Sequence, residues 1–193
     1  MRHIKGTSTG LGACVLALAC ASSASVGYAA DSTGAGNGVV ASTWQHHKVT
    51  FPFNGLTSKY NCNGLEDSVR HILMHFGARS DAKVSAGGCG AGTSVPGGRA
   101  FIDADFYTLA PAAESGSSDT VAAHWTAKHL DPNHPYFMDY GSCELVQQMQ
   151  DLITKNFAIQ DLQYRTDCFP HDINLHGFSV KGMALTAIST AKS

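Results

Sequence analysis

Basic side chains are scarce in this chain of 193 residues, which carries 13 Lys and Arg against 15 Asp and Glu. Arg2 and Lys5 lie in a segment that we expect to be removed, which leaves 11 basic against 15 acidic residues and a net charge of −4. Binding to phosphate requires a basic surface. We therefore expect no nucleic acid partner, and no binding to an anionic membrane surface.

Long apolar runs are also missing. The longest, Leu11–Ala21, has eleven residues, whereas a helix that crosses a bilayer needs roughly 20. The run follows two basic residues and precedes small ones, which is the layout of a secretory signal peptide. We expect residues 1–29 to be a signal peptide, with cleavage after Ala24 as an alternative, and no transmembrane span in the rest. The expected location is periplasmic or secreted; a lipoprotein, modified at Cys20, is a weaker alternative.

Several catalytic and metal-binding motifs are absent. The sequence has no C-x-x-C pair, no G-x-S-x-G nucleophile motif and no phosphate-binding loop. After signal removal, an even number of cysteines remains in an exported chain, which predicts two disulfides rather than a four-cysteine zinc site. The four remaining cysteines are Cys62, Cys89, Cys143 and Cys168.

In the rest of the chain, segments in which apolar and polar residues alternate, as in strands, are interspersed with segments in which apolar residues recur at helical spacing. Residues 30–43 are rich in Gly and Ser and predict a flexible tether, and residues 44–188 predict a single disulfide-stabilised α+β domain. Asn63 and Glu66 have the spacing of a capping box at the start of a helix that Gly77 ends; Ser142 is expected to begin a second helix. The expected strands are 47–53, 82–86, 100–107, 121–128, one around 162–164, and one within 173–185 with a bulge near Gly177.

The predicted elements follow the order strand, helix, strand, strand twice. Cys62 opens the first helix and Cys89 closes the next strand, and Cys143 and Cys168 hold the same two positions in the second half. We therefore expect a pseudo-duplicated β-α-β-β repeat, in which an antiparallel sheet carries two helices on one face. The repeat favours the pairs Cys62–Cys89 and Cys143–Cys168 among the three pairings that four cysteines allow.

The segment Tyr60-Asn-Cys62-Asn-Gly64-Leu65-Glu66, together with Phe76-Gly77-Ala78-Arg79 and Cys143-Glu144-Leu145-Val146, resembles a family of short exported gammaproteobacterial proteins with a Y-x-C-x-G-L-E motif. The resemblance covers about residues 50–185. No activity is established for that family, so the resemblance implies export and the cysteine framework and assigns no functional residue.

Histidines suggest a metal site as one possible function. His71 and His75 lie one helical turn apart, and such a pair can bind Zn²⁺ or Cu²⁺ weakly. If strands 100–107 and 121–128 form a hairpin, Asp105 lies opposite His124 and can orient its imidazole. The spacing fixes no third ligand, and a solvated helix face and a cross-strand ion pair explain the same residues without a metal.

The turn between the two halves carries clustered apolar side chains, namely Tyr136, Phe137, Met138 and Tyr140. Such a cluster in a loop is typical of a recognition surface, although it can also fold back as a lid on the core. We therefore expect a non-enzymatic binding module without a required cofactor, whose ligand is an envelope or extracellular protein or a small molecule. A histidine-based periplasmic Zn or Cu binding protein is the alternative, and a hydrolase with residues assembled only by the fold is the third possibility.

Overall fold

A computed structural model describes residues 38–55, 60–89, 98–112, 120–168 and 177–188, all within one unit, residues 35–193. The expected signal peptide and residues 30–37 of the expected tether lie outside the described residues. Within these ranges the fold is mixed α and β, as predicted. Its strands are β1 (Val40–Gly55), β2 (Lys83–Gly87), β3 (Gly98–Pro111), β4 (Val121–Leu130), β5 (Ile159–Thr166) and β6 (Phe178–Ala187); its helices are α1 (Cys62–His75), α3 (Cys143–Gln148) and α4 (Gln150–Asn156), with a 3₁₀ turn, η1, at Tyr140–Ser142.

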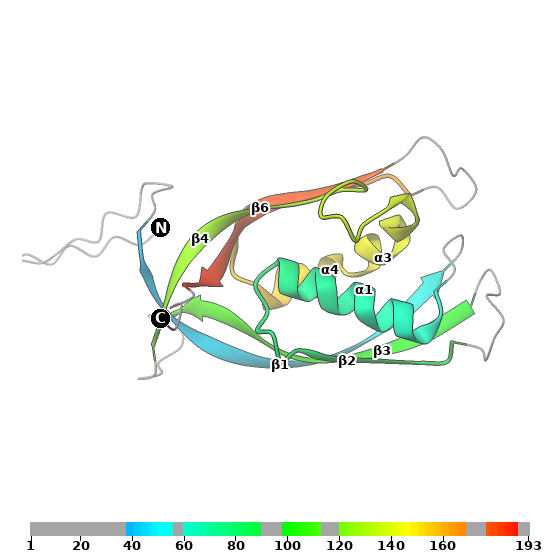
Figure 1. Ribbon diagram of the computed structural model, residues 1–193, viewed down its shortest axis with the longest axis horizontal. Coiled ribbons are helices and arrows are strands. Elements are labelled where there is room, and N and C mark those ends of the chain that lie inside the picture. The colour runs from blue at the N-terminus through cyan, green and yellow to red at the C-terminus, as the bar shows by residue number, and fades with distance from the viewer. Residues whose placement is uncertain (1–37, 56–59, 90–97, 113–119, 169–176, 189–193) are drawn as a thin grey trace, which may run out of the picture. The chain divides into compact units, whose positions relative to one another are not determined.

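The strands form one antiparallel sheet in the order β2-β3-β1-β4-β6-β5. β1 pairs with β3 along nearly its whole length, but with β4 only through Val40, Ala41 and Ser42. The sheet therefore consists of two halves that are joined at one end, and in Figure 1 the helices lie between them. Buried side chains from helices and strands of both halves form one core.

β1 begins earlier than the sequence predicts, because Val40 to Thr43 belong to the strand and not to a tether. Ser42 and Thr43 are 0% and 2% exposed at the junction of the two halves. A second small core of Leu109, Ala123 and Leu185 lies there as well. Hydrophobic patterning misses such a strand, since its buried residues are small and polar.

The helix α1 is capped two residues before the predicted position. The side chain of Asn61 accepts a hydrogen bond from the Gly64 N–H at 2.6 Å. The predicted stripe is buried, and Gly77 follows the helix with φ of 103°, a conformation that favours glycine. Glu66 does not complete a capping box; its Oε1 accepts a hydrogen bond from the Ala86 N–H of β2 at 2.8 Å.

The second predicted helix is two short ones that meet at Met149. Its predicted stripe of Leu145, Met149, Leu152 and Ile153 is buried as expected. The disulfides Cys62–Cys89 and Cys143–Cys168 have the predicted pairing, with Cα atoms 5.5 and 5.7 Å apart. Each ties the start of a helix to the chain just after the next strand.

The bulge predicted near Gly177 borders residues 169–176, which lie outside the described residues. The register of β5 against β6 shifts between Gln160 and Gln163, so an irregularity lies in β5. Asp161 adopts a positive φ of 52° at this point. Gly182 lies opposite, where a Cβ would come within 2.7 Å of the Ile159 side chain. The bulge therefore depends on a glycine in the partner strand.

Candidate functional site

The segment from Asp131 to Asp139 is a turn held by its own hydrogen bonds. The backbones of Asp131 and His134 exchange two hydrogen bonds of 2.8 and 3.1 Å, and Asp131 Oδ1 accepts a third from the Asn133 N–H at 2.7 Å. At the other end, the Met138 N–H donates to the Pro135 carbonyl at 2.9 Å. These bonds fix the position of the aromatic side chains between them.

The four side chains predicted as a recognition surface have different environments. Met138 is 5% exposed and belongs to the core, so it is not a surface residue. Phe137 is half-buried and packs against the core. Tyr136 is 94% exposed. The backbone of Tyr140 opens η1, and its side chain lies outside what the structure describes.

Phe137 joins the aromatic turn to the histidines of α1. Its ring centroid lies 5.0 Å from that of His71 and 6.5 Å from that of His75. The two groups that the sequence presents as separate candidates are therefore one contiguous surface. The turn rests on the helix through Phe137 and presents Tyr136 to solvent.

His75 is not the solvated ligand that the helix pattern predicts. Its Nε2 is buried and has no hydrogen-bond partner among the described residues. Burial lowers the pKa of His75 to about 4, with smaller contributions from the nearby charges of Lys128 and His129. A hydrogen bond with the backbone of His129 acts in the opposite direction and is outweighed. His75 is therefore neutral at neutral pH, and the ring of Phe137 lies beside it.

The predicted pairing of Asp105 with His124 is wrong. β3 does not form a hairpin with β4, because β1 lies between them in the sheet. His124 pairs with Thr186 of β6, whereas Asp105 pairs with Lys48 of β1 and Lys83 of β2. The two residues predicted to act together therefore belong to different halves of the sheet.

Asp105 instead contacts His46, a residue that the sequence pattern did not single out. His46 Nε2 lies 2.7 Å from Asp105 Oδ1, and Lys48 Nζ lies 3.4 Å from Oδ2. The hydrogen bond from His46, followed by that from Lys48, lowers the pKa of Asp105. Extending the strand period from Thr50 back through Lys48 would have placed His46 on the same face.

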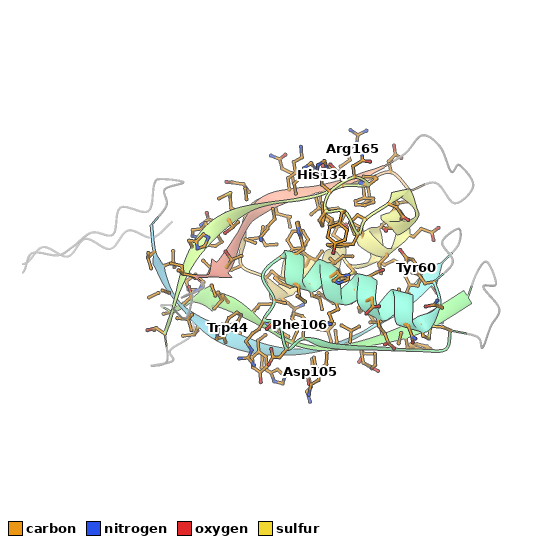
Figure 2. The ribbon with its side chains drawn as sticks, in the orientation of Figure 1. Trp44, Tyr60, Asp105, Phe106, His134 and Arg165 are labelled. Carbon is orange, nitrogen blue, oxygen red and sulfur yellow. A yellow bond between two sulfur atoms is a disulfide. The ribbon has the colours of Figure 1, made fainter. Side chains whose placement is uncertain are left out.

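The ring of Tyr107 stacks on that of His46, with centroids 4.6 Å apart, and the Arg79 guanidinium lies 3.8 Å from the Tyr107 centroid. Arg79 also forms a bidentate ion pair with Asp81, in which its guanidinium donates hydrogen bonds of 2.8 and 2.7 Å to the two carboxylate oxygens. Figure 2 places Asp105 on the side of β1 and β3 that faces away from the helices.

A third histidine group surrounds Asp131. Its carboxylate lies 3.2 Å from His129 Nε2 and 3.4 Å from His134 Nδ1. Burial raises the pKa of Asp131, but the Asn133 N–H and the two histidines outweigh it and lower the pKa. The described residues contain no group of three or more His, Cys, Asp or Glu side chains arranged to hold a metal ion.

The remaining histidine contact of note is that of His47 with Thr108, 2.8 Å apart. The Thr108 hydroxyl donates its only proton to the Asn156 carbonyl at 2.7 Å, so it accepts from His47. A hydroxyl bonded in this way is not activated as a nucleophile, because the histidine is not its base. The contact joins β1 and β3 to the end of α4 and supports no hydrolytic step.

The described helices are all too short or too polar to cross a bilayer. Of the sequence candidates, the fold brings Phe137 onto His71 and His75, separates Asp105 from His124, and exposes Tyr136. Searches of protein-family models, curated sequences and solved structures find nothing that matches this chain, so its function has to be inferred from its own residues.

Proposed function

We propose that this protein is an exported binding module that recognises its partner through a surface centred on Tyr136. We call this the Tyr136 surface and define it as Tyr136, Phe137, His71 and Met74. The single observation that carries the proposal is the 94% exposure of Tyr136 at the tip of a turn that is otherwise anchored on the fold. Nothing in the packing of the described residues requires an aromatic ring there.

The anchoring of the turn favours binding. The ring of Phe137 lies tilted against that of His71, the ring of Tyr136 meets that of Phe137 edge-on at 5.9 Å, and Met138 is held in the core. A ring held in place loses little conformational entropy when a partner covers it. Tyrosine is also among the residues that contribute most to interface affinity.

Apolar surface on α1 extends the contact area beyond the turn. Met74 is 37% exposed and lies three residues after His71, so the two side chains are neighbours on one helix face. The exposed surface thus combines a phenol, a thioether and an imidazole. A partner with a shallow apolar depression and hydrogen-bond acceptors around it complements these groups.

Export and internal duplication belong to the same proposal. Two disulfides are consistent with an oxidising compartment. The strand order β2-β3-β1-β4-β6-β5 reads the same from either end when β1, β2 and β3 are matched to β4, β5 and β6. The disulfide separations of 27 and 25 residues agree with that match. We infer two β-α-β-β halves related by an axis between β1 and β4.

The proposal can be tested by affinity capture from an envelope extract with the mature protein, its Tyr136→Ala variant and a Phe101→Ala control. Phe101 is also an exposed aromatic residue, 53% exposed, but it lies on β3. We expect a specific partner that the wild-type protein and the control retain and that Tyr136→Ala loses. Equal capture of that partner by all three proteins would contradict the Tyr136 surface.

A further inference from the structure

The outer face of the β2-β3-β1 half carries a second feature, a hollow of about 320 Å³. We call it the outer hollow and define it by the polar side chains that line it: Lys48 and Thr50 of β1, Lys83 and Ser85 of β2, and Asp103 and Asp105 of β3. Ile102, Ala104 and Phe106 alternate with these aspartates and are buried in the core. The aspartates therefore face away from the helices, on the side where Figure 2 shows Asp105.

Four of these six polar side chains already make polar contacts within the protein. Both oxygens of Asp105 are engaged, one by His46 and the other by Lys48. Asp103 Oδ1 accepts a hydrogen bond from the Thr50 hydroxyl at 2.6 Å. These contacts fix the carboxylates on the floor of the outer hollow.

Two opposite charges there, those of Lys83 and Asp103, make no ion pair with a described residue. Among the described residues, no carboxylate lies within ion-pair distance of the Lys83 ammonium, and no cation lies within that distance of Asp103. Lys83 is directly opposite Asp105 and Ser85 is directly opposite Asp103. Lys83 and Asp103 are therefore diagonal neighbours on one face of the sheet, with about 7–8 Å between their Cα atoms.

Opposite charges at diagonal positions on one face suit a small molecule with one ammonium and one carboxylate. In an α-amino acid the two groups are about 3 Å apart, as the backbone bond lengths dictate. With a charge-assisted hydrogen bond of about 2.8 Å at each end, the ligand spans roughly 8 Å between the two side-chain head groups. The four-carbon stem of Lys83 is flexible, so its ammonium can take up that distance from the Asp103 carboxylate. The volume is at the lower end of the range for small-molecule sites, which also fits a ligand of amino-acid size.

We propose that the outer hollow binds the zwitterionic group of a free amino acid, with Asp103 accepting from its ammonium and Lys83 donating to its carboxylate. Ser85, between Lys83 and the end of β2, supplies a further hydroxyl to the carboxylate. The four ionised side chains of the hollow sum to zero charge, so a zwitterion enters without a net electrostatic penalty. This site is separate from the Tyr136 surface, and either proposal can fail without the other.

The test uses L-alanine as the probe and backbone amide shifts of the full mature chain as the readout. Exposed charge pairs bind weakly, so we expect a Kd of about 1 mM. Titration to about 10 mM alanine would then nearly saturate the site. We expect saturable shifts at β2 and β3, and at least a tenfold weaker Kd in both Lys83→Gln and Asp103→Asn. Lys155→Gln and Asp151→Asn are the matched controls, because these residues form an exposed pair on α4.

Two modified probes separate the charges. N-acetylalanine lacks the ammonium and alaninamide lacks the carboxylate, so we expect each to bind at least tenfold more weakly than alanine. The proposal is overturned if alanine causes no saturable shift, if either modified probe binds as well as alanine, or if the controls weaken binding as much as the two site variants. Binding of an uncharged sugar with alanine silent would equally overturn the assignment to amino acids.

Discussion

The ring of Phe137 lies 5.0 Å from the ring of His71, and this contact joins the turn between β4 and α3 to helix α1. Tyr136, its neighbour in the chain, lies on the exposed side of the same turn. Adjacent aromatic residues thus have separate roles. One fixes the turn, and the other is free to meet a partner.

Substitution of each ring by alanine separates these roles. Phe137→Ala should lower the free energy of unfolding by about 2 kcal/mol, less than the roughly 3–5 kcal/mol for a fully buried Phe, because Phe137 is half-buried. For a domain of this size, that is a fall of about 4–8 °C in Tm. Tyr136→Ala should stay within about 0.5 kcal/mol of wild type. Thermal melts measure both, and a similar loss in the two variants would contradict the division of roles.

His75 should make the domain less stable in acid. Its folded-state pKa of about 4 lies below the ordinary value of 6.5. Between about pH 4 and pH 6.5, His75 is therefore protonated in the unfolded chain and neutral in the folded chain. The contribution of neutral His75 is complete above pH 6.5 and declines as pH falls towards 4. Burial, followed by the charge of His46, also lowers the pKa of His47, which acts in the same direction.

Urea unfolding at pH 7 and pH 4.5 measures this dependence. His75→Gln should reduce the difference in unfolding free energy between the two pH values. His124→Gln is the matched control, since the imidazole of His124 makes no hydrogen bond or ring contact with a described residue. A pH dependence that is the same in wild type and His75→Gln would show that His75 is not responsible.

The start of β1 should be essential, although its sequence resembles a linker. A chain that begins at Gly38 keeps the pairs of Val40, Ala41 and Ser42 with β4, and one that begins at Thr43 loses them. These pairs are what joins β1 to β4 in the sheet, and Ser42 is fully buried. We expect the shorter chain to lose about 2 kcal/mol or more, at about 1 kcal/mol per hydrogen bond lost. Melting temperatures within two degrees of each other would restore the tether interpretation.

Local patterns in the sequence predicted the helix stripes, most of the strands and the disulfide pairing, because each depends on residues close in the chain or on a repeated order of elements. Long-range placement was not predictable in the same way. Asp105 and His124 alternate correctly within their own strands, yet the insertion of β1 between β3 and β4 separates them. A pattern within one strand determines which face a residue occupies, and it carries no information on which strand becomes its neighbour.

The same limit applies to the candidate site. The exposed Tyr136 and the buried Met138 are two residues apart in a turn without periodicity, so their environments depend on how the turn lies on α1. Lys83 and Asp103 are brought close together on one face of the sheet only by the pairing of β2 with β3. The cap at Asn61 in place of Asn63 is a smaller error, since both residues have the chemistry of a cap and only the backbone decides between them.

Glu66 is a further polar residue whose position suggests a specific role. Among the described strands β2 is the last on its side of the sheet, so the N–H groups on its outer edge have no described strand to bond. Such an edge can pair with another chain. The carboxylate of Glu66 accepts the Ala86 N–H at 2.8 Å and so joins α1 to that edge.

Removing this acceptor should therefore expose the edge of β2. Glu66→Ala leaves a half-buried N–H without its partner, which costs about 1–3 kcal/mol, and should increase self-association through β2. Glu66→Gln retains a carbonyl oxygen of similar reach and should lose clearly less stability while remaining as monomeric as wild type. Urea unfolding gives the free energies, and light scattering over a concentration series gives the association state. If Glu66→Ala neither loses stability nor associates more than Glu66→Gln, the hydrogen bond to Ala86 does not protect this edge.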